Sequence, residues 1–184
     1  MKLLPLPVEV ALLLMVLAAA VSDIRSRSIP NWLTLGGIAA GLALNTYCTG
    51  LAGLKFTAIG FGVAALLFLP LFALRFLGGG DVKIMAAVGA LAGYENLLAI
   101  FIFDAIFGGI AALILVIVRG RFRKTLRNTG QMIMSLFKGK APYRENEELE
   151  AGSEKSLGIP RAVTIAAATL LILWASRVPV PPGH

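Results

Sequence analysis

Cysteine is nearly absent from this sequence, which contains a single one, Cys48. One cysteine excludes a disulfide within the chain and a zinc site built from CxxC pairs. Charge is also scarce, because charged residues make up 15% of the chain, against roughly 25% in soluble domains. The pattern GxxxxGK[ST] does not occur either, so no phosphate-binding loop of that type is predicted. An ordinary soluble domain and a disulfide scaffold are therefore excluded.

Apolar residues, in contrast, make up 58% of the chain, and the mean hydropathy is +0.83. A helix needs about 20 predominantly apolar residues to cross a bilayer. We predict an all-α integral membrane protein, one domain over residues 1–184, with about six membrane-spanning helices. The fourth is short, since at 1.5 Å per residue it reaches only about 20 Å. The predicted spans are Leu4–Val21, Asn31–Tyr47, Phe56–Phe76, Val82–Tyr94, Asn96–Val118 and Pro160–Ser176.

Two glycine patterns indicate close contacts between these helices. The segments Gly37-Ile-Ala-Ala-Gly41 and Gly89-Ala-Leu-Ala-Gly93 each place glycines on one helical face. Small residues at this spacing let the backbones of neighbouring membrane helices approach closely. No longer internal repeat is evident, which argues against a transporter built from inverted halves.

The distribution of lysine and arginine predicts the orientation of the helices. With the N-terminus outside, only Lys2, Lys55 and Arg177 of the 17 basic residues fall on outer segments. Basic residues gather on cytoplasmic loops, so both termini are predicted to be non-cytoplasmic. The net charge of +7 follows from this bias, and no nucleic-acid partner is predicted.

One long polar segment, at about residues 119–158, is predicted to be a cytoplasmic loop. Its first half, RGRFRKTLRNTGQMIMSLFKGK, mixes basic and apolar residues, as in a helix lying in the membrane interface. Its second half contains YRENEELEAGSEKS, which is acidic and poor in apolar residues, as in a linker. A solvated connector without a chemical role is the simpler interpretation of the whole segment.

Five acidic residues lie in or beside the predicted spans: Glu9, Asp23, Asp81, Glu95 and Asp104. Ionisable groups at such depth are costly and indicate function by default. The predicted orientation places Asp23 and Asp81 at the same cytoplasmic level. Glu95 falls in the outer turn GYEN, where a solvated loop or a helix cap explains it. Asp104 lies deeper, and a hydrogen bond to a neighbouring helix is its simpler interpretation.

Asp23 and Asp81, which are predicted to lie at the same membrane level, can each also be explained by a purely structural role. Asp23, in SDIRSRSIPNW, is near enough in sequence to pair with Arg25 or Arg27, as a surface ion pair of little worth. Asp81, in LGGGDVK, is placed to cap the following helix, and the preceding glycines permit close approach of a second segment.

Considered together, the two aspartates indicate a hydrolytic site. Two carboxylates within a few ångströms of each other cannot both ionise at low cost, so the pair holds one proton near neutrality. The charged member takes a proton from water, while the protonated member hydrogen-bonds the scissile carbonyl and later protonates the leaving amide. Such hydrolysis needs neither a metal nor a nucleophilic side chain, so no cofactor is predicted.

These segments resemble those of the prepilin peptidases, membrane aspartic proteases of the GxGD type. Asp23 with the following IRSRSIPNW resembles the family's first catalytic segment, and GGGDVK at residues 78–83 resembles its GxGD motif. The resemblance implies a GxGD architecture in the bacterial inner membrane, with the active site facing the cytoplasm. It also implies a catalytic pair and supporting residues, namely Asp23 and Asp81 with Gly78, Gly80 and Lys83.

The implied substrate is the short basic leader of a type IV prepilin-like protein, cut before an apolar helix that stays in the bilayer. Larger members carry paired cysteines in a cytoplasmic domain and N-methylate the new terminus, whereas this chain has Cys48 alone. N-methyltransferase activity is therefore not predicted. The short form is similar to the peptidases of tight-adherence (Flp-type) pili and their pseudopilins, and archaeal preflagellin peptidases share the aspartate pair.

Two other functions stay open at this point. Asp81 and Asp104 are also compatible with a proton relay in a small transporter or channel subunit. Alternatively, the chain is a non-catalytic subunit of a pilus or secretion apparatus, in which the 119–158 loop matters and the aspartates do not. Replacing each aspartate by asparagine distinguishes the three functions.

Overall fold

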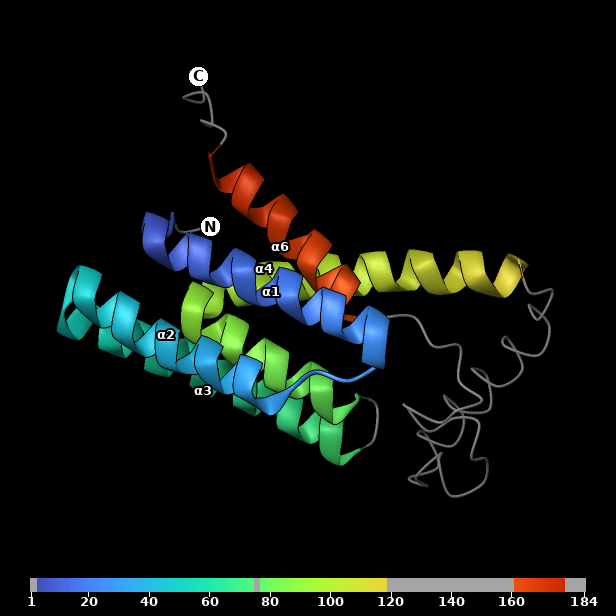
Figure 1. Ribbon diagram of the computed structural model, residues 1–184, viewed down its shortest axis with the longest axis horizontal. Coiled ribbons are helices and arrows are strands. Elements are labelled where there is room, and N and C mark those ends of the chain that lie inside the picture. Colours follow the sequence, from blue (N-terminus) through green and yellow to red (C-terminus); the bar gives the residue numbers. More distant parts are fainter. Residues whose placement is uncertain (1–2, 75–76, 119–160, 178–184) are drawn as a thin grey trace.

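The computed structural model describes residues 3–74, 77–118 and 161–177, and the regular structure in these ranges is entirely α-helical (Figure 1). The all-α prediction is thereby confirmed, while the predicted loop at 119–158 lies outside the described residues. The helices are α1 (Leu6–Ser26), α2 (Asn31–Thr49), α3 (Leu51–Ala73), α4 (Gly79–Val118) and α6 (Arg161–Arg177).

Three helical stretches are long and apolar enough to cross a membrane: Leu6–Ser26, Leu51–Ala73 and Gly79–Leu115. Large apolar side chains cover the outside of the bundle, and Leu66 and Ile114, for example, are 75% and 56% exposed. Such a surface is costly in water and suits a lipid environment. The chain is therefore a membrane protein, whereas the full set of six spans stays a prediction.

Helix α4 reverses direction within its length. Gly93 has φ 74° and ψ 172°, which interrupts the helical backbone. Figure 1 shows the first half of α4, in green, running into the bundle and the second half, in yellow, running back. The positive φ favours glycine, and the ring of Phe56 lies where a side chain at Gly93 would start. The two halves correspond to the predicted fourth and fifth helices, which the sequence separates at Glu95 instead.

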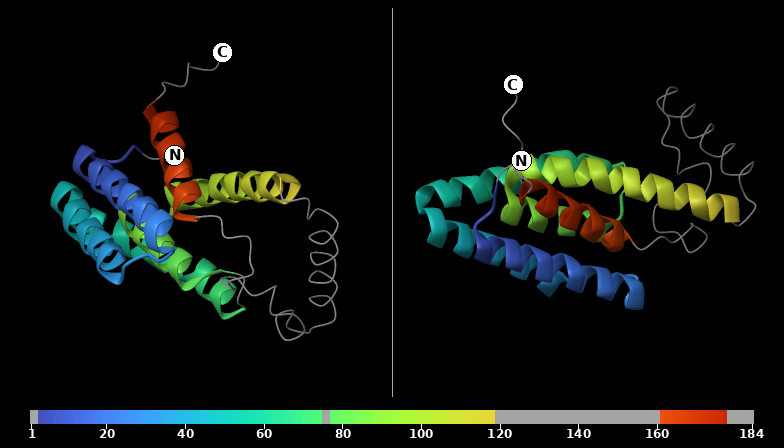
Figure 2. Two further views of the ribbon diagram at one scale, coloured as in Figure 1. Left: turned by 45° about the vertical axis from the view of Figure 1, so that its right-hand side comes forward. Right: turned by 90° about the horizontal axis from the view of Figure 1, so that it is seen from above.

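The first half of α4 is the central helix of the bundle. Its residues Ile84, Ala87, Val88 and Leu91 are 0% exposed, and α4 contacts each of the other four described helices. Its second half extends beyond the bundle in all three views of Figures 1 and 2. Its residues 84–93 are apolar and almost all buried, so this part of the helix is held by packing rather than by one amphipathic face.

Glycines bring the backbones of α2 and α3 against this central helix. The Gly89 carbonyl oxygen occupies the place of a Cβ at Gly60, and the Ala90 carbonyl oxygen lies 2.8 Å from where a Gly41 Cβ would be. A methyl group at either position would meet backbone atoms, which cannot rotate away. The close packing that the glycine patterns indicate is confirmed.

A buried polar residue, Asn45, ties three helices together. Its side-chain amide donates to the Thr57 hydroxyl at 3.0 Å and to the carbonyl oxygens of Ala90 and Leu91, each at 3.2 Å. Both carbonyls lie in the last turn before Gly93, where a helix end leaves carbonyl groups without helical partners. Asn45 therefore stabilises the reversal of α4 from the side of α2.

We expect Asn45→Ala to lower the free energy of unfolding by about 2 kcal/mol, because the Thr57 hydroxyl and the Ala90 and Leu91 carbonyls each lose a buried hydrogen bond. The measurement is the unfolding of the purified protein in mixed detergent micelles. Asn31→Ala is the matched control on the same helix, since Asn31 is exposed and its side-chain oxygen accepts a hydrogen bond from the exposed Lys83. Equal losses from the two variants would contradict the stabilising role of Asn45.

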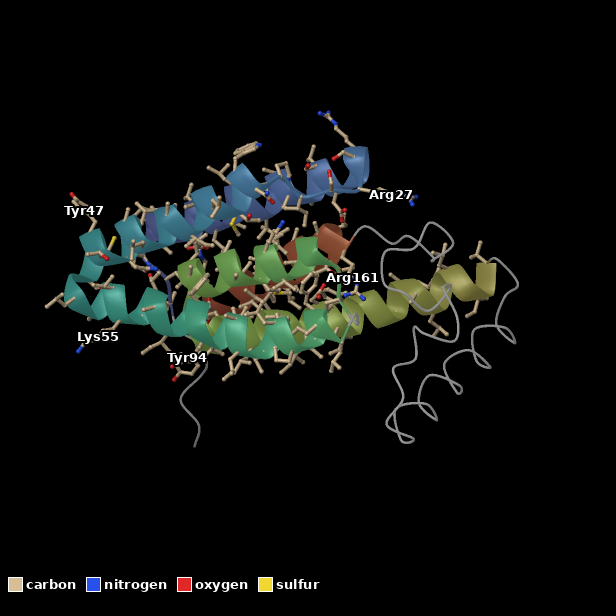
Figure 3. All side chains as sticks on the ribbon, turned by 90° about the horizontal axis from the view of Figure 1, so that it is seen from below. Arg27, Tyr47, Lys55, Tyr94 and Arg161 are labelled. Carbon is tan, nitrogen blue, oxygen red and sulfur yellow. The ribbon has the colours of Figure 1, made fainter. Side chains whose placement is uncertain are left out.

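The bundle has two distinct ends. Figure 3 shows Tyr47, Lys55 and Tyr94 toward one end and Arg27 and Arg161 toward the other. Helices α1 and α6 run antiparallel between them, and at the first end the Arg177 guanidinium donates to the Glu9 carboxylate at 2.7 Å. The polar residues that follow the apolar run of α1 are helical to Ser26, so Asp23 lies inside its last turns.

Candidate active site

Asp23 projects from the end of α1 to the beginning of α6. Its Oδ2 accepts a hydrogen bond of 3.0 Å from the backbone N–H of Ala162, the second residue of α6. The first N–H groups of a helix have no partners within the helix and carry partial positive charge, so a carboxylate is stabilised there. The sequence also allows an ion pair of Asp23 with Arg25 or Arg27. In the structure, Asp23 accepts a hydrogen bond from the Ala162 N–H of α6.

Asp81 lies in the first turn of α4 rather than at the capping position, because the helix begins at Gly79. Its backbone N–H donates to the Gly78 carbonyl at 3.1 Å. Its Oδ2 forms an ion pair of 3.2 Å with Nη1 of Arg161, and the Asp81 side chain is only 16% exposed. The negative charge of Asp81 is therefore held by a cation from α6.

Asp104 lies level with Asp81, on the returning half of α4. Asp81 precedes Gly93 by twelve residues and Asp104 follows it by eleven, so each is about 17 Å of helix from the reversal. Oδ1 of Asp104 accepts a hydrogen bond of 2.6 Å from the Thr164 hydroxyl of α6. The hydrogen bond to a neighbouring helix that the sequence suggests for Asp104 is present.

The first turn of α6 thus contacts all three aspartates. Arg161 pairs with Asp81, the N–H of Ala162 with Asp23, and Thr164 with Asp104. The carboxylates of Asp23 and Asp104 and the guanidinium of Arg161 all contribute to the electrostatic field at Asp81. Two aspartates that are distant in the chain are therefore placed at one end of the bundle, against consecutive residues of one helix.

A cavity of about 460 Å³ opens beside these groups. Its polar lining comes from Asp81, Asp104, Arg161 and Thr164, and its apolar walls include Phe68 and Phe101. These two rings pack edge to face, with centroids 5.0 Å apart. The cavity therefore combines charged groups on one side with an apolar wall on the other, as binding sites generally do.

The residues that support the motif have separate places. Gly78 lies beside the Asp81 carboxylate, and Gly80 faces the side chain of Ile29 in the loop before α2. Lys83 is exposed, and its Nζ donates to Oδ1 of Asn31 at 2.8 Å. Gly80 and Lys83 therefore fasten the start of α4 to the start of α2, and Lys83 does not line the cavity.

Two residues of the site, Arg161 and Thr164, are not predicted from the sequence. Arg161 is one of many basic residues on the predicted cytoplasmic side, although its position directly after Pro160, at the start of a predicted helix, places it at the level of Asp23 and Asp81. Thr164 gives no comparable indication, because threonine is common in membrane helices. In the sequence, α6 is separated from α4 by residues 119–160, so its alignment with α1 and α4 cannot be inferred from sequence spacing.

Comparison with known proteins identifies the chain's relatives. A family model described as the type IV leader peptidase family matches residues 10–113. Asp23, Asp81 and Asp104 fall inside this range and α6 falls outside it.

Two curated proteins match, both named prepilin leader peptidase/N-methyltransferase, from Burkholderia pseudomallei strains 1026b and K96243. Each is 34% identical over 115 residues, which cover 58% of this chain and 36% of the relative. The match therefore spans about a third of the length of these relatives. No solved structure matches significantly. Since the family model covers more than half of the sequence, the chain belongs to the type IV leader peptidase family.

Proposed function

We propose that this protein is a membrane-embedded aspartic endopeptidase that removes the leader peptide of type IV prepilin-like proteins, with Asp23 and Asp81 as its catalytic pair. One observation carries the proposal: consecutive residues of α6, Arg161 and Ala162, contact the carboxylates of Asp81 and Asp23 respectively. Two acids bound to consecutive residues of one helix, in a chain of the leader peptidase family, support this proposal, because amide hydrolysis requires an acid and a base.

The pair performs acid–base catalysis on a water molecule. One aspartate is ionised and takes a proton from water as the water attacks the scissile carbonyl carbon. The other is protonated, hydrogen-bonds the carbonyl oxygen and delivers its proton to the leaving amide nitrogen. The cavity beside Asp81 accepts a substrate side chain near the scissile bond, while the apolar outer surface of the bundle contacts the apolar helix of the substrate in the bilayer.

The site belongs at the cytoplasmic face of the bacterial inner membrane. Arg25, Arg27, Lys83 and Arg161 lie at the end of the bundle that carries the aspartates, while Lys55 and Arg177 lie toward the other. This bias supports an orientation with both termini outside and six spans. The preferred substrates are Flp-type pilins and pseudopilins, and the chain cleaves without N-methylating the product.

The test is direct cleavage in liposomes that contain the purified protein and a Flp-type prepilin. We expect a product shortened by its leader, identified by intact mass, and none from a variant with both Asp23 and Asp81 replaced by asparagine. Asp104→Asn should still yield the shortened product, although the change removes a negative charge near Asp81 and weakens one hydrogen bond, that from Thr164. An uncut prepilin in the presence of folded protein would contradict the proposal.

A proton relay is the second candidate function, and one observation favours it: Asp81 and Asp104 line the same cavity. A relay moves protons across the membrane without substrate cleavage. Liposomes carrying an internal pH dye separate the two functions. Proton flux that disappears in Asp104→Asn, together with an absence of cleavage, would favour the relay.

A further inference from the structure

Helix α6 lies beyond the residues that match the family model, yet it supplies direct partners for both aspartates. We propose that Arg161 is a positioning residue of the active site, which holds the Asp81 carboxylate in place through an ion pair from outside the two motifs. This inference rests on the proposed function and adds to it a residue that neither motif contains.

The charges that reach the two aspartates differ in size. Asp81 has the guanidinium of Arg161 at 3.2 Å, a full positive charge. Asp23 has one neutral N–H at 3.0 Å, at the beginning of a helix, where the aligned peptide dipoles amount to roughly half a charge. Arg161 is therefore the stronger of the two partners that α6 supplies, and without it the largely buried Asp81 carboxylate would lose the cation that partly offsets its burial.

Burial and a neighbouring acid both disfavour a negative charge on Asp81, and Arg161 offsets part of their effect. Asp104, on the returning half of α4, adds negative charge near Asp81. The Asp104 carboxylate accepts a hydrogen bond from the Thr164 hydroxyl. The positive charge of Arg161 also attracts the Asp104 carboxylate. The guanidinium therefore balances two acids that line one cavity. Without Arg161, the negative charges of Asp81 and Asp104 would repel each other across that cavity.

Hydrogen bonds at the start of α6 fix the backbone position of Arg161, whereas its side chain is half exposed and makes one contact. The Thr164 hydroxyl lies 2.8 Å from the Arg161 carbonyl, and the Ala162 N–H is bound to Asp23. The Arg161 side chain is 51% exposed and reaches Asp81 through a single terminal nitrogen. One point contact depends on charge more than on the planar shape of a guanidinium, so a lysine ammonium is able to replace it.

The experiment compares Arg161→Gln and Arg161→Lys with Arg177→Gln in the liposome cleavage assay, and measures kcat and KM separately. Arg177 is the matched control, since it is an arginine of the same helix that pairs with a carboxylate, that of Glu9, and is 57% exposed. We expect Arg161→Gln to lower kcat roughly 10- to 100-fold with little change in KM, the effect of losing one charged contact at a reacting group. Arg161→Lys should recover most of that loss, and Arg177→Gln should leave kcat unchanged.

Two results would overturn the role of Arg161: equal kcat values for Arg161→Gln and Arg177→Gln, or a folded Arg161→Lys that is as slow as Arg161→Gln. Rates are normalised to folded protein, measured by thermal unfolding in detergent, and Arg161→Met replaces the glutamine variant if that variant folds poorly. The proposed function fails separately, when Asp81→Asn still cleaves the prepilin. Loss of cleavage in Asp81→Asn, combined with no effect of Arg161→Gln, would remove only the role of Arg161.

Discussion

Replacing Asp81 by asparagine is expected to lower the rate of leader cleavage by roughly a thousandfold or more, and replacing Asp23 should do the same. Asparagine keeps the size of the side chain but can neither take a proton from water nor donate an acidic one. Each change therefore removes one half of an acid–base pair while it disturbs packing little. The measurement is the initial rate of product formation in liposomes, with the amount of protein per liposome held equal.

The double variant and a neighbouring aspartate provide the controls. Residues that act as a unit are strongly non-additive, so the variant with both replacements should be no slower than either single one. Asp104→Asn is the matched change, because Asp104 lines the same cavity as Asp81 and is bound to the same turn of α6. Independent, multiplying effects of Asp23→Asn and Asp81→Asn would show that the two carboxylates do not share one step.

Gly60→Ala is expected to destabilise the fold by about 3 kcal/mol, whereas Gly62→Ala should be neutral or slightly stabilising. A Cβ at Gly60 would coincide with the Gly89 carbonyl of α4, while a Cβ at Gly62 has no atom within 4 Å. Overpacking against backbone forces whole helices apart, but alanine is otherwise the better helix former by up to about 1 kcal/mol. Unfolding in mixed micelles, followed by circular dichroism, measures both free energies.

Comparing two positions in one helix removes the influence of helix propensity from the result. The Gly60→Ala protein should also lose cleavage activity, because the α3–α4 contact holds the helix that carries Asp81 in its first turn. Similar unfolding free energies for the two variants would mean that α3 and α4 do not approach as closely as the glycine contacts indicate.

The helices are largely predictable from the sequence because apolar runs define them. The predicted span Pro160–Ser176 and the observed α6, Arg161–Arg177, nearly coincide. The prediction for α1 stops at Val21, where the apolar residues stop, but the helix continues to Ser26. There the Ser26 hydroxyl donates to the Ser22 carbonyl at 2.8 Å. Hydropathy reports where lipid contact ends, and a helix can continue into the polar interface beyond it.

The candidate site is predictable only in part. Counting helices and basic residues places Asp23 and Asp81 at one level, and the structure brings both to the first turn of α6. The same reasoning places Asp104 deeper, because it assumes a reversal at Glu95 and says nothing of which face each half of α4 presents. The pairing of Arg161 with Asp81 is not predicted, because the two residues are 80 positions apart and meet only through the packing of α6 against α4.

Since Asp23 and Asp81 both take partners from α6, the order in which the chain is synthesised has a consequence. Helices α1 to α4 leave the ribosome before α6, and until α6 docks, neither aspartate has its contact with Ala162 or Arg161. A nascent chain that has not yet inserted α6 into the membrane thus contains both aspartates without their partners on α6. Under the proposed function, proteolytic activity therefore requires the docking of α6, the last helix that the structure describes.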